Sequence, residues 1–233
     1  MIKNLNLKFK ILSILLIPFA GLLYFSYVFI ADKILIQREM ENIESYASYS
    51  VSIISLIHEI QRERGYSTLF LENTETNYST LLDAQRNLAN IEFNNFDELM
   101  NAQLLNAFPE EFNSGYIEFK TNLINLDETR KSIDLIKIDG NSTIIYYSNL
   151  NSILISMVSE MSNTTSNQRI RSTINAYISL LQITEIAGIE RAVLSSVFSA
   201  NRFSDGMYRR FQVLIAEETI YSNGFHSYAT PEQ

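Results

Sequence analysis

The sequence predicts an all-α protein in which an N-terminal transmembrane helix precedes an antiparallel helical bundle. Three prolines and seven glycines among 233 residues leave few sites that break a helix. Residues 11–30 carry no charge and match the roughly 20 residues that cross a bilayer. Beyond them, apolar residues recur at alternating steps of three and four, as in packed helices. We therefore predict a terminal segment 1–10, a span 11–30 and one bundle 31–233.

The first element is the span at 11–30. A cleaved signal peptide is the alternative, but its apolar core is only about 7–15 residues long and ends at a small-residue cleavage site, and neither feature is clear here. Lys3, Lys8 and Lys10 precede the span, whereas the charges of 32–33 cancel after it. The positive-inside rule then predicts a single-pass protein with its N-terminus in the cytoplasm and its bundle outside.

The later helices follow from their breaks and caps. The pattern continues from the span to about Leu71, a second helix fits 78–105, and a third fits 109–133, where proline and two glutamates suit a first turn. A turn at 139–142 is followed by a helix that is predicted to end at about Met161. A capping loop at 162–165 then precedes a helix that ends at about Ala200. The last predicted helix starts at Met207 and fades over 224–231.

Composition limits the function. The chain carries a net charge of −8, and residues 1–33 are net basic, so the predicted bundle is strongly acidic and nucleic-acid binding is improbable. Without cysteine there is no disulfide, thiolate metal site or cysteine nucleophile. His58 and His226 have no ligand partners at metal-site spacing, so we predict neither a metal nor a cofactor.

Two arginines occupy positions where a packed helix is normally apolar. Arg64 continues the stripe of Ile53, Ile57 and Ile60, and Arg191 falls within a second stripe at 180–198. An unpaired buried charge is costly, so each arginine needs an anionic partner, either internal or bound. Arg62 lies about 200° around the helix from Arg64, so at most one of them faces inward, and the stripe favours Arg64.

Polar residues interrupt the apolar stripes in three places. They are Gln61-Arg62-Glu63-Arg64-Gly65, Ala84-Gln85-Arg86 and Glu185-Ile186-Ala187-Gly188-Ile189-Glu190-Arg191-Ala192. Ala187, Gly188 and Ala192 are small enough for a neighbouring backbone to approach closely, which predicts a small pocket. A guanidinium pairs two in-plane oxygens at once, so facing arginines favour a planar anion such as nitrate or nitrite.

At these motifs the chain resembles the nitrate- and nitrite-sensing (NIT) domain of bacterial transmembrane receptors, from about His58 to about Ala229. The resemblance implies an all-helical periplasmic bundle, usually homodimeric, on the cytoplasmic (inner) membrane. It also implies a small-anion ligand held by arginines, which we assign to Arg64 and Arg191, then Arg62 and Arg86. The remaining motif residues are expected to support them: Gln61, Glu63, Gly65, Glu185, Gly188, Glu190 and Ala192.

The resemblance further implies a receptor input for chemotaxis or another signalling pathway. Family members usually continue into a second span and a methyl-accepting, kinase or cyclic-dinucleotide output region. We expect this chain to be a sensor input that is incomplete at its C-terminus and lacks its output.

Two alternatives follow from the same residues. Arg64 paired with Glu190, and Arg191 paired with Glu63 or Glu185, would form an internal network in a tethered interaction or structural protein that senses nothing. Catalysis by Glu63 and Glu190 lacks a nucleophile, a metal cluster or a phosphate loop, so we predict no enzyme. The sequence alone does not choose between nitrate, nitrite and other small anions.

Overall fold

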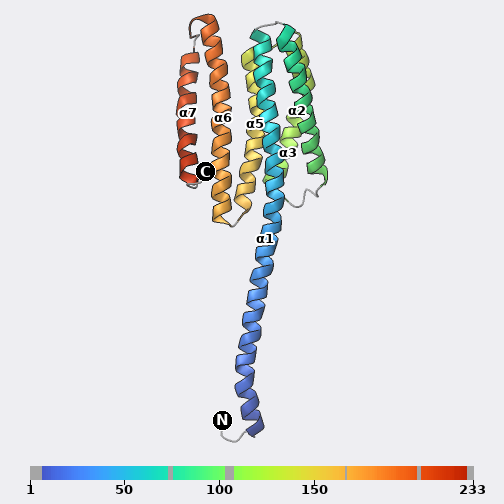
Figure 1. The fold of residues 1–233 in the computed structure, drawn as a ribbon, viewed down its shortest axis with the longest axis vertical. Coiled ribbons are helices and arrows are strands. Elements are labelled where there is room, and N and C mark those ends of the chain that lie inside the picture. Colours follow the sequence, from blue (N-terminus) through green and yellow to red (C-terminus); the bar gives the residue numbers. More distant parts are fainter. Residues whose placement is uncertain (1–6, 73–75, 103–107, 166, 204–205, 230–233) are drawn as a thin grey trace. The chain divides into compact units, whose positions relative to one another are not determined.

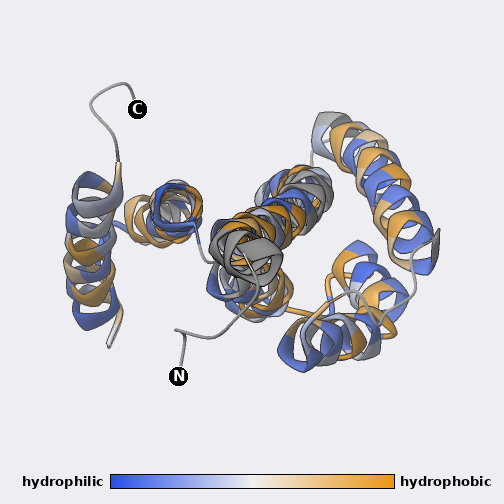
Figure 2. Cartoon of the chain, turned by 90° about the horizontal axis from the view of Figure 1, so that it is seen from below, coloured by the Kyte–Doolittle hydropathy of each residue, from blue (hydrophilic) through white to orange (hydrophobic). Residues whose placement is uncertain are grey.

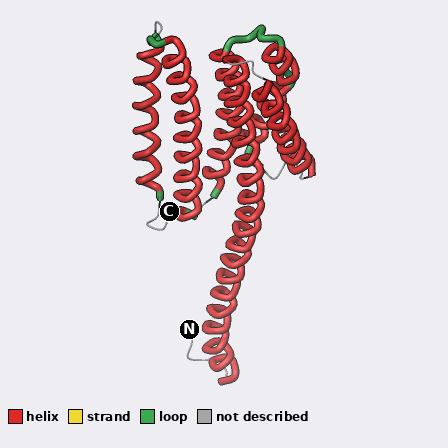
Figure 3. The backbone as a smooth tube through the Cα atoms, turned by 45° about the horizontal axis from the view of Figure 1, so that its top comes forward, coloured by secondary structure: helices red, strands yellow, loops and turns green. Residues whose placement is uncertain are grey.

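The computed structural model describes the backbone of residues 7–72, 76–102, 108–165, 167–203 and 206–229. Some side chains within these ranges, mainly between residues 7 and 47, lie outside the described residues. The described residues form helices and no strand, which confirms the all-α prediction (Figure 3). The helices are α1 (Leu7–Glu72), α2 (Thr76–Ala102), α3 (Glu110–Leu123), α4 (Leu126–Asp134), α5 (Gly140–Thr164), α6 (Gln168–Ala200) and α7 (Met207–Tyr228).

The chain divides into two compact units, residues 1–46 and residues 47–233. In the first unit, no helix contains a stretch of described residues long and apolar enough to cross a bilayer, and the same holds for the described residues of the second. The predicted span at 11–30 is therefore not supported by the structure. Within that span, the side chains of residues 11–14 and 17 lie outside the described residues, as do residues 1–6 before it.

One predicted helix is divided. The helix predicted over 109–133 is interrupted at residues 124–125. The carbonyl oxygen of Asn122 accepts the backbone N–H of Asn125 at 3.3 Å and the hydroxyl of Tyr146 at 3.1 Å. An i→i+3 hydrogen bond tightens the chain at a helix end, so α3 stops here and α4 begins after it.

Side-chain caps set the starts of α5 and α6. Asp139, in the predicted turn, accepts the backbone N–H of Ser142 at 2.8 Å, so α5 begins one residue later. That hydrogen bond lowers the pKa of Asp139, which keeps the cap charged. Asn167 caps α6 in the same way, accepting from the backbone of Arg169 at 3.0 Å. The predicted helix end at residue 105 and the fading end at 230–231 lie outside the described residues.

In the second unit, α5 packs on α3, α6 packs on α5, and α7 packs on α6 (Figure 1). The helices carry both hydrophobic and hydrophilic residues around their axes, as packed amphipathic helices do (Figure 2). Aromatic rings fill the core between α2 and α3, where the ring of Phe96 contacts those of Tyr116 and Phe119. The predicted inward stripe of α1 is confirmed, because Ile53, Ile57, Ile60, Arg64 and Ser67 are all buried.

The predicted inward stripe of α6 is wrong. Arg191 is exposed, and Phe198, which lies on the same face, is 78% exposed. The buried face of α6 instead carries Ile186, Val193 and Val197, which pack around Leu214 of α7. Helix α6 is apolar on several sides, so periodicity alone could not decide which side meets its neighbours.

Candidate functional site

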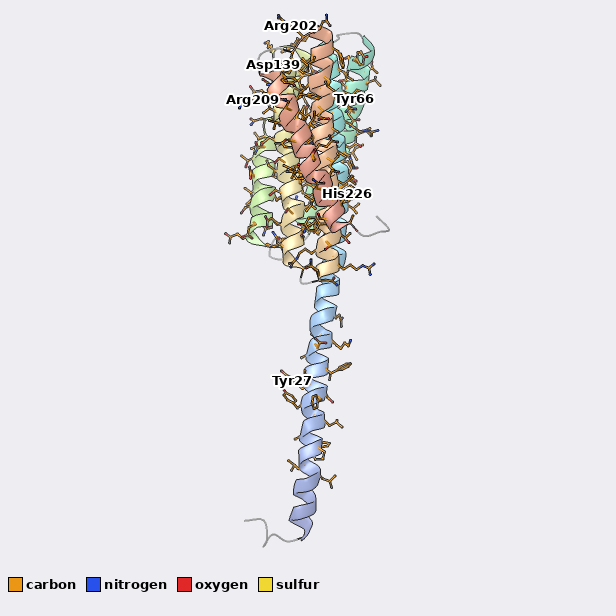
Figure 4. The ribbon with its side chains drawn as sticks, turned by 90° about the vertical axis from the view of Figure 1, so that its left-hand side faces the viewer. Tyr27, Tyr66, Asp139, Arg202, Arg209 and His226 are labelled. Carbon is orange, nitrogen blue, oxygen red and sulfur yellow. The ribbon has the colours of Figure 1, made fainter. Side chains whose placement is uncertain are left out.

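Helices α1 and α6 line a cleft of about 940 Å³, to which α5 contributes Ile144. Tyr66, which also lines the cleft, lies toward the end of the second unit that carries Asp139, whereas His226 lies toward the other end (Figure 4). Both long motifs reach this cleft, although they are far apart in the sequence. The motif residues on its wall are Gln61, Arg62, Arg64, Gly65, Ala187, Gly188, Arg191 and Ala192.

Arg64 is held by a buried ion pair at the edge of this cleft. Its Nη1 donates to a carboxylate oxygen of Glu185 and, at 2.6 Å, to Oγ of Ser148. The other oxygen of Glu185 accepts from Nε2 of Gln61 at 3.1 Å and from Nδ2 of Asn151 at 2.9 Å. The Glu185 carboxylate, only 6% exposed at the residue level, thus joins α6 to α1 and α5 and neutralises Arg64.

Gly188 makes room for the guanidinium of Arg64. A Cβ at Gly188 would lie 2.5 Å from Nη2 of Arg64, closer than real Cβ contacts. Gly188 follows Glu185 by three residues, which places both on one face of α6. The glutamate-x-x-glycine spacing therefore supplies a carboxylate for Arg64 and the space beside it.

The other two cleft arginines are exposed. The side chain of Arg62 is 64% exposed, and its Nη1 lies 3.4 Å from Glu59 in an exposed pair of the kind that contributes little stability. Arg191 is exposed and makes no hydrogen bond or ion pair with any other described residue. The cleft thus presents cationic side chains from both α1 and α6 that a ligand can reach.

Glu63, one residue before Arg64, belongs to a different cluster. Its fully buried carboxylate accepts Nε and Nη2 of Arg130, both at 2.7 Å, and the hydroxyl of Tyr147 at 2.8 Å. Burial alone would lower the pKa of Arg130, but the hydrogen bonds and charge of Glu63 outweigh it and raise that pKa. Burial and the Glu63 charge raise the pKa of Tyr147, so the phenol remains a donor. This cluster ties α1 to α4 and α5.

Arg86 is not brought to the cleft. Its Nη1 lies 2.8 Å from Asp134, and its Nε lies 3.9 Å from Glu63. It therefore extends the Glu63–Arg130 cluster rather than facing Arg64 and Arg191. Of the four predicted ligand arginines, the cleft brings together Arg64, Arg191 and Arg62.

Glu190 is half-buried and pairs with neither motif arginine. One of its oxygens is buried and has no hydrogen-bond partner among the described residues. Burial raises the pKa of Glu190, and the charge of Glu218 on α7 raises it further. The internal pairs predicted as an alternative, Arg64 with Glu190 and Arg191 with Glu63 or Glu185, are therefore not the ones formed.

Sequence reasoning missed several residues outside the motifs that hold the motif side chains, among them Ser148, Asn151, Arg130 and Tyr147. Asn151 falls on the apolar stripe of Tyr147, Leu150 and Leu154 in α5, which is the same signal that revealed Arg64 and could have found it. Ser148 stands in the mostly polar run of residues 148–152 and carried no such signal. Arg130 stands among charged residues of α4, and Tyr147 among aromatic ones, so neither carried a local signal. Within the described residues, no group of three or more histidine, aspartate or glutamate side chains is placed to hold a metal ion.

A sequence model of the family described as nitrate and nitrite sensing (NIT) matches residues 55–233, which include both motifs and the whole cleft. The chain belongs to the NIT family. The match of this NIT domain to the family model confirms the resemblance that was predicted from its two motifs. No curated protein matches the chain.

A solved structure of the NasR transcription antiterminator is similar to this NIT domain in fold. The TM-score is 0.79 at 20% sequence identity, over 84% of this chain and 53% of that one. The chain thus spans about half the length of that protein, and the likeness concerns the fold alone.

Proposed function

We propose that this NIT domain binds nitrate or nitrite in the cleft between α1 and α6, where Arg64, Arg191 and Arg62 contact the anion. The observation that carries the proposal is the convergence of both motifs on this cleft, with Arg191 unpaired among the described residues. Planar oxyanions suit guanidinium groups, because each fork of N–H donors matches two in-plane oxygens. The protein acts by binding and performs no chemistry of its own.

We also propose how the domain is placed and used. Its N-terminal segment tethers it to a bacterial inner membrane, with 11–30 as the single span and 31–233 as a periplasmic, homodimeric sensor for an output module. Support comes from the apolar side chains of Leu15, Phe19, Leu22 and Phe25, which are each more than half exposed. Such a concentration of exposed apolar surface is typical of membrane or protein contacts. A ligand-induced shift of α1 then carries the signal.

The alternative is a tethered bundle whose arginines only form internal pairs. A specific observation favours it: Arg62, Arg64 and Arg86 each have an acidic neighbour, namely Glu59, Glu185 and Asp134. Arg191 has no acidic partner among the described residues, and it therefore distinguishes the anion sensor from the structural bundle. An exposed arginine without a partner does not stabilise a purely structural bundle, whereas an anion sensor requires it for ligand binding.

Calorimetric titration of nitrate and nitrite into the purified full-length chain tests the proposal, with chloride and sulfate as controls. We expect saturable nitrate or nitrite binding that weakens roughly tenfold to hundredfold in Arg191→Ala, since hydrogen bonds to charged groups contribute about 1.5–3 kcal/mol. Arg191→Ala should unfold like the wild type because Arg191 is exposed and unpaired. Arg64→Ala should lose both binding and stability, because it leaves the Glu185 charge buried.

Arg169→Ala is a matched control, because Arg169 is an exposed arginine of α6 outside the cleft. It should bind nitrate as the wild type does. Absence of nitrate and nitrite binding by the folded chain, or unchanged binding by Arg191→Ala, would contradict the proposal and favour the structural alternative.

A further inference from the structure

We propose that Glu185 is a built-in competitor of the anion for Arg64, and that a bound anion takes over Arg64 by displacing the Glu185 carboxylate. This inference rests on the proposed function, because it requires an oxyanion to bind in the cleft. It assigns Glu185, which the motif only marks as a supporting residue, the role of setting ligand affinity.

Three side-chain donors surround the Glu185 carboxylate. Its two oxygens are held by Nη1 of Arg64, Nε2 of Gln61 and Nδ2 of Asn151. One charged and two neutral donors from α1 and α5 thus converge on one buried planar acceptor. This is the donor arrangement that binds a small planar oxyanion, and here the acceptor belongs to the protein itself.

The Glu185 carboxylate and the proposed ligand are chemically alike. The O–C–O group of a carboxylate and the O–N–O group of nitrate or nitrite are both planar, anionic acceptors with two oxygens on one edge. Whatever donors suit one of them suit the other. An anion that reaches Arg64 from the cleft therefore competes directly with Glu185 for the same guanidinium.

Arg64 pairs with Glu185 and also lines the cleft. The hydrogen bonds of Arg64 to described residues use its Nη1. Its Nη2 lies beside Gly188, and both Arg64 and Gly188 line the cleft. Arg62 and Arg191 line the same cleft but form no hydrogen bond or ion pair with Glu185. An anion first meets these exposed arginines, and it gains Nη1 of Arg64 only when Glu185 releases it. The apparent affinity is reduced by the fraction of molecules in which Arg64 is occupied by Glu185.

The exchange also identifies which helix contact changes on binding. Gln61 and Arg64 join α1 to α6 through Glu185, whereas Glu63 and Arg130 join α1 to α4 independently. Displacing Glu185 releases α6 from α1 and leaves the other connection of α1 in place. The ligand thus alters one helix interface by differential interaction, as a conformational signal requires.

Calorimetric titration of nitrate into the full-length Glu185→Gln chain tests the inference. Glutamine keeps the shape of the side chain but removes its charge, so we expect nitrate to bind about tenfold more tightly than to the wild type. A merely structural role for Glu185 predicts the opposite, because losing a buried anchor of the site weakens binding. Circular dichroism verifies that the variant is folded.

Asn151→Ala is a second variant that keeps all arginines and the Glu185 charge. It removes one of the two neutral donors that hold Glu185, so nitrate affinity should rise by a few fold. This variant decides the outcome if Glu185→Gln does not fold. Nitrate binding by the wild type with unchanged or weaker binding by the folded variants would overturn the inference and leave the proposed function intact. Absence of nitrate binding by the wild type and both variants would overturn both.

Discussion

At the residue scale, Arg64 and Arg191 share a cleft but differ in what holds them. Arg64 is 4% exposed and is neutralised by Glu185, so it stabilises the folded bundle even without a ligand. Arg191 is exposed and has no partner among the described residues, so its charge is available. Arg64 is therefore expected to contribute to both stability and ligand binding, and Arg191 to ligand binding alone.

Gly188 allows a direct test of the space beside Arg64. In a helix interior, Gly→Ala normally stabilises by about 0.5–1 kcal/mol. At Gly188 the added methyl meets Nη2 of Arg64 at 2.5 Å, so we expect Gly188→Ala to lower the free energy of unfolding by about 1–3 kcal/mol. Urea unfolding followed by circular dichroism measures the difference.

Gly65→Ala is the matched control for Gly188→Ala, because a Cβ at Gly65 meets nothing within 4 Å. We expect this variant to gain about 0.5–1 kcal/mol in unfolding free energy. Equal effects of the two substitutions would show that Arg64 does not need the space at Gly188.

At the element scale, two of the polar clusters on α1 join it to different helices. Gln61 and Arg64, three residues apart on one face, reach Glu185 of α6. Glu63 reaches Arg130 of α4 and Tyr147 of α5. The two clusters together fix the rotation of α1 and hence the direction in which Arg64 points.

We expect Arg130→Met to lower the free energy of unfolding by about 3–5 kcal/mol, because it leaves the buried Glu63 carboxylate without its main partner. The exposed neighbour Lys131 is the control, and Lys131→Met should change stability by less than about 0.5 kcal/mol. Denaturant unfolding of both variants gives the comparison.

Replacing both members of this pair, as in Glu63→Leu with Arg130→Met, should recover much of the loss, since no charge then remains unpaired. If Arg130→Met is as stable as Lys131→Met, the cluster does not hold α1 in place.

At the scale of the whole molecule, the second unit contains the core, the cleft and both clusters. Its described core begins at Tyr49 on α1 and extends to Leu214 on α7, within residues 47–233. The chain is acidic at −8 overall, yet it gathers three arginines on one cleft. Local arrangement, rather than the long-range field, therefore has to attract an anion.

The division into two units predicts that the bundle folds without its N-terminal segment. A chain lacking residues 1–46 should unfold in one cooperative transition, with a melting temperature within about 4 °C of the full-length chain. Thermal unfolding followed by circular dichroism measures both. A large fall in melting temperature would show that residues 1–46 stabilise the bundle.

By itself, the sequence determined the helical class, most helix boundaries and the two motifs of the site. Scarce glycine and proline, periodic apolar residues and local caps such as Asp139 act over a few residues, so they can be identified without a fold. The inward position of Arg64 was equally predictable, because Arg64 continues the stripe of Ile53, Ile57 and Ile60, all of which are buried.

Only the tertiary structure decided which charges meet. In the folded chain, Arg64 pairs with Glu185 rather than Glu190, and Glu63 pairs with Arg130. Arg86 lies outside the cleft beside Asp134, and Arg191 is exposed. Each of these depends on the rotation and offset of helices distant in sequence, and α6 is apolar on more than one side. The side of α6 that faces α1 is set by the summed packing of its neighbours, which no local pattern contains.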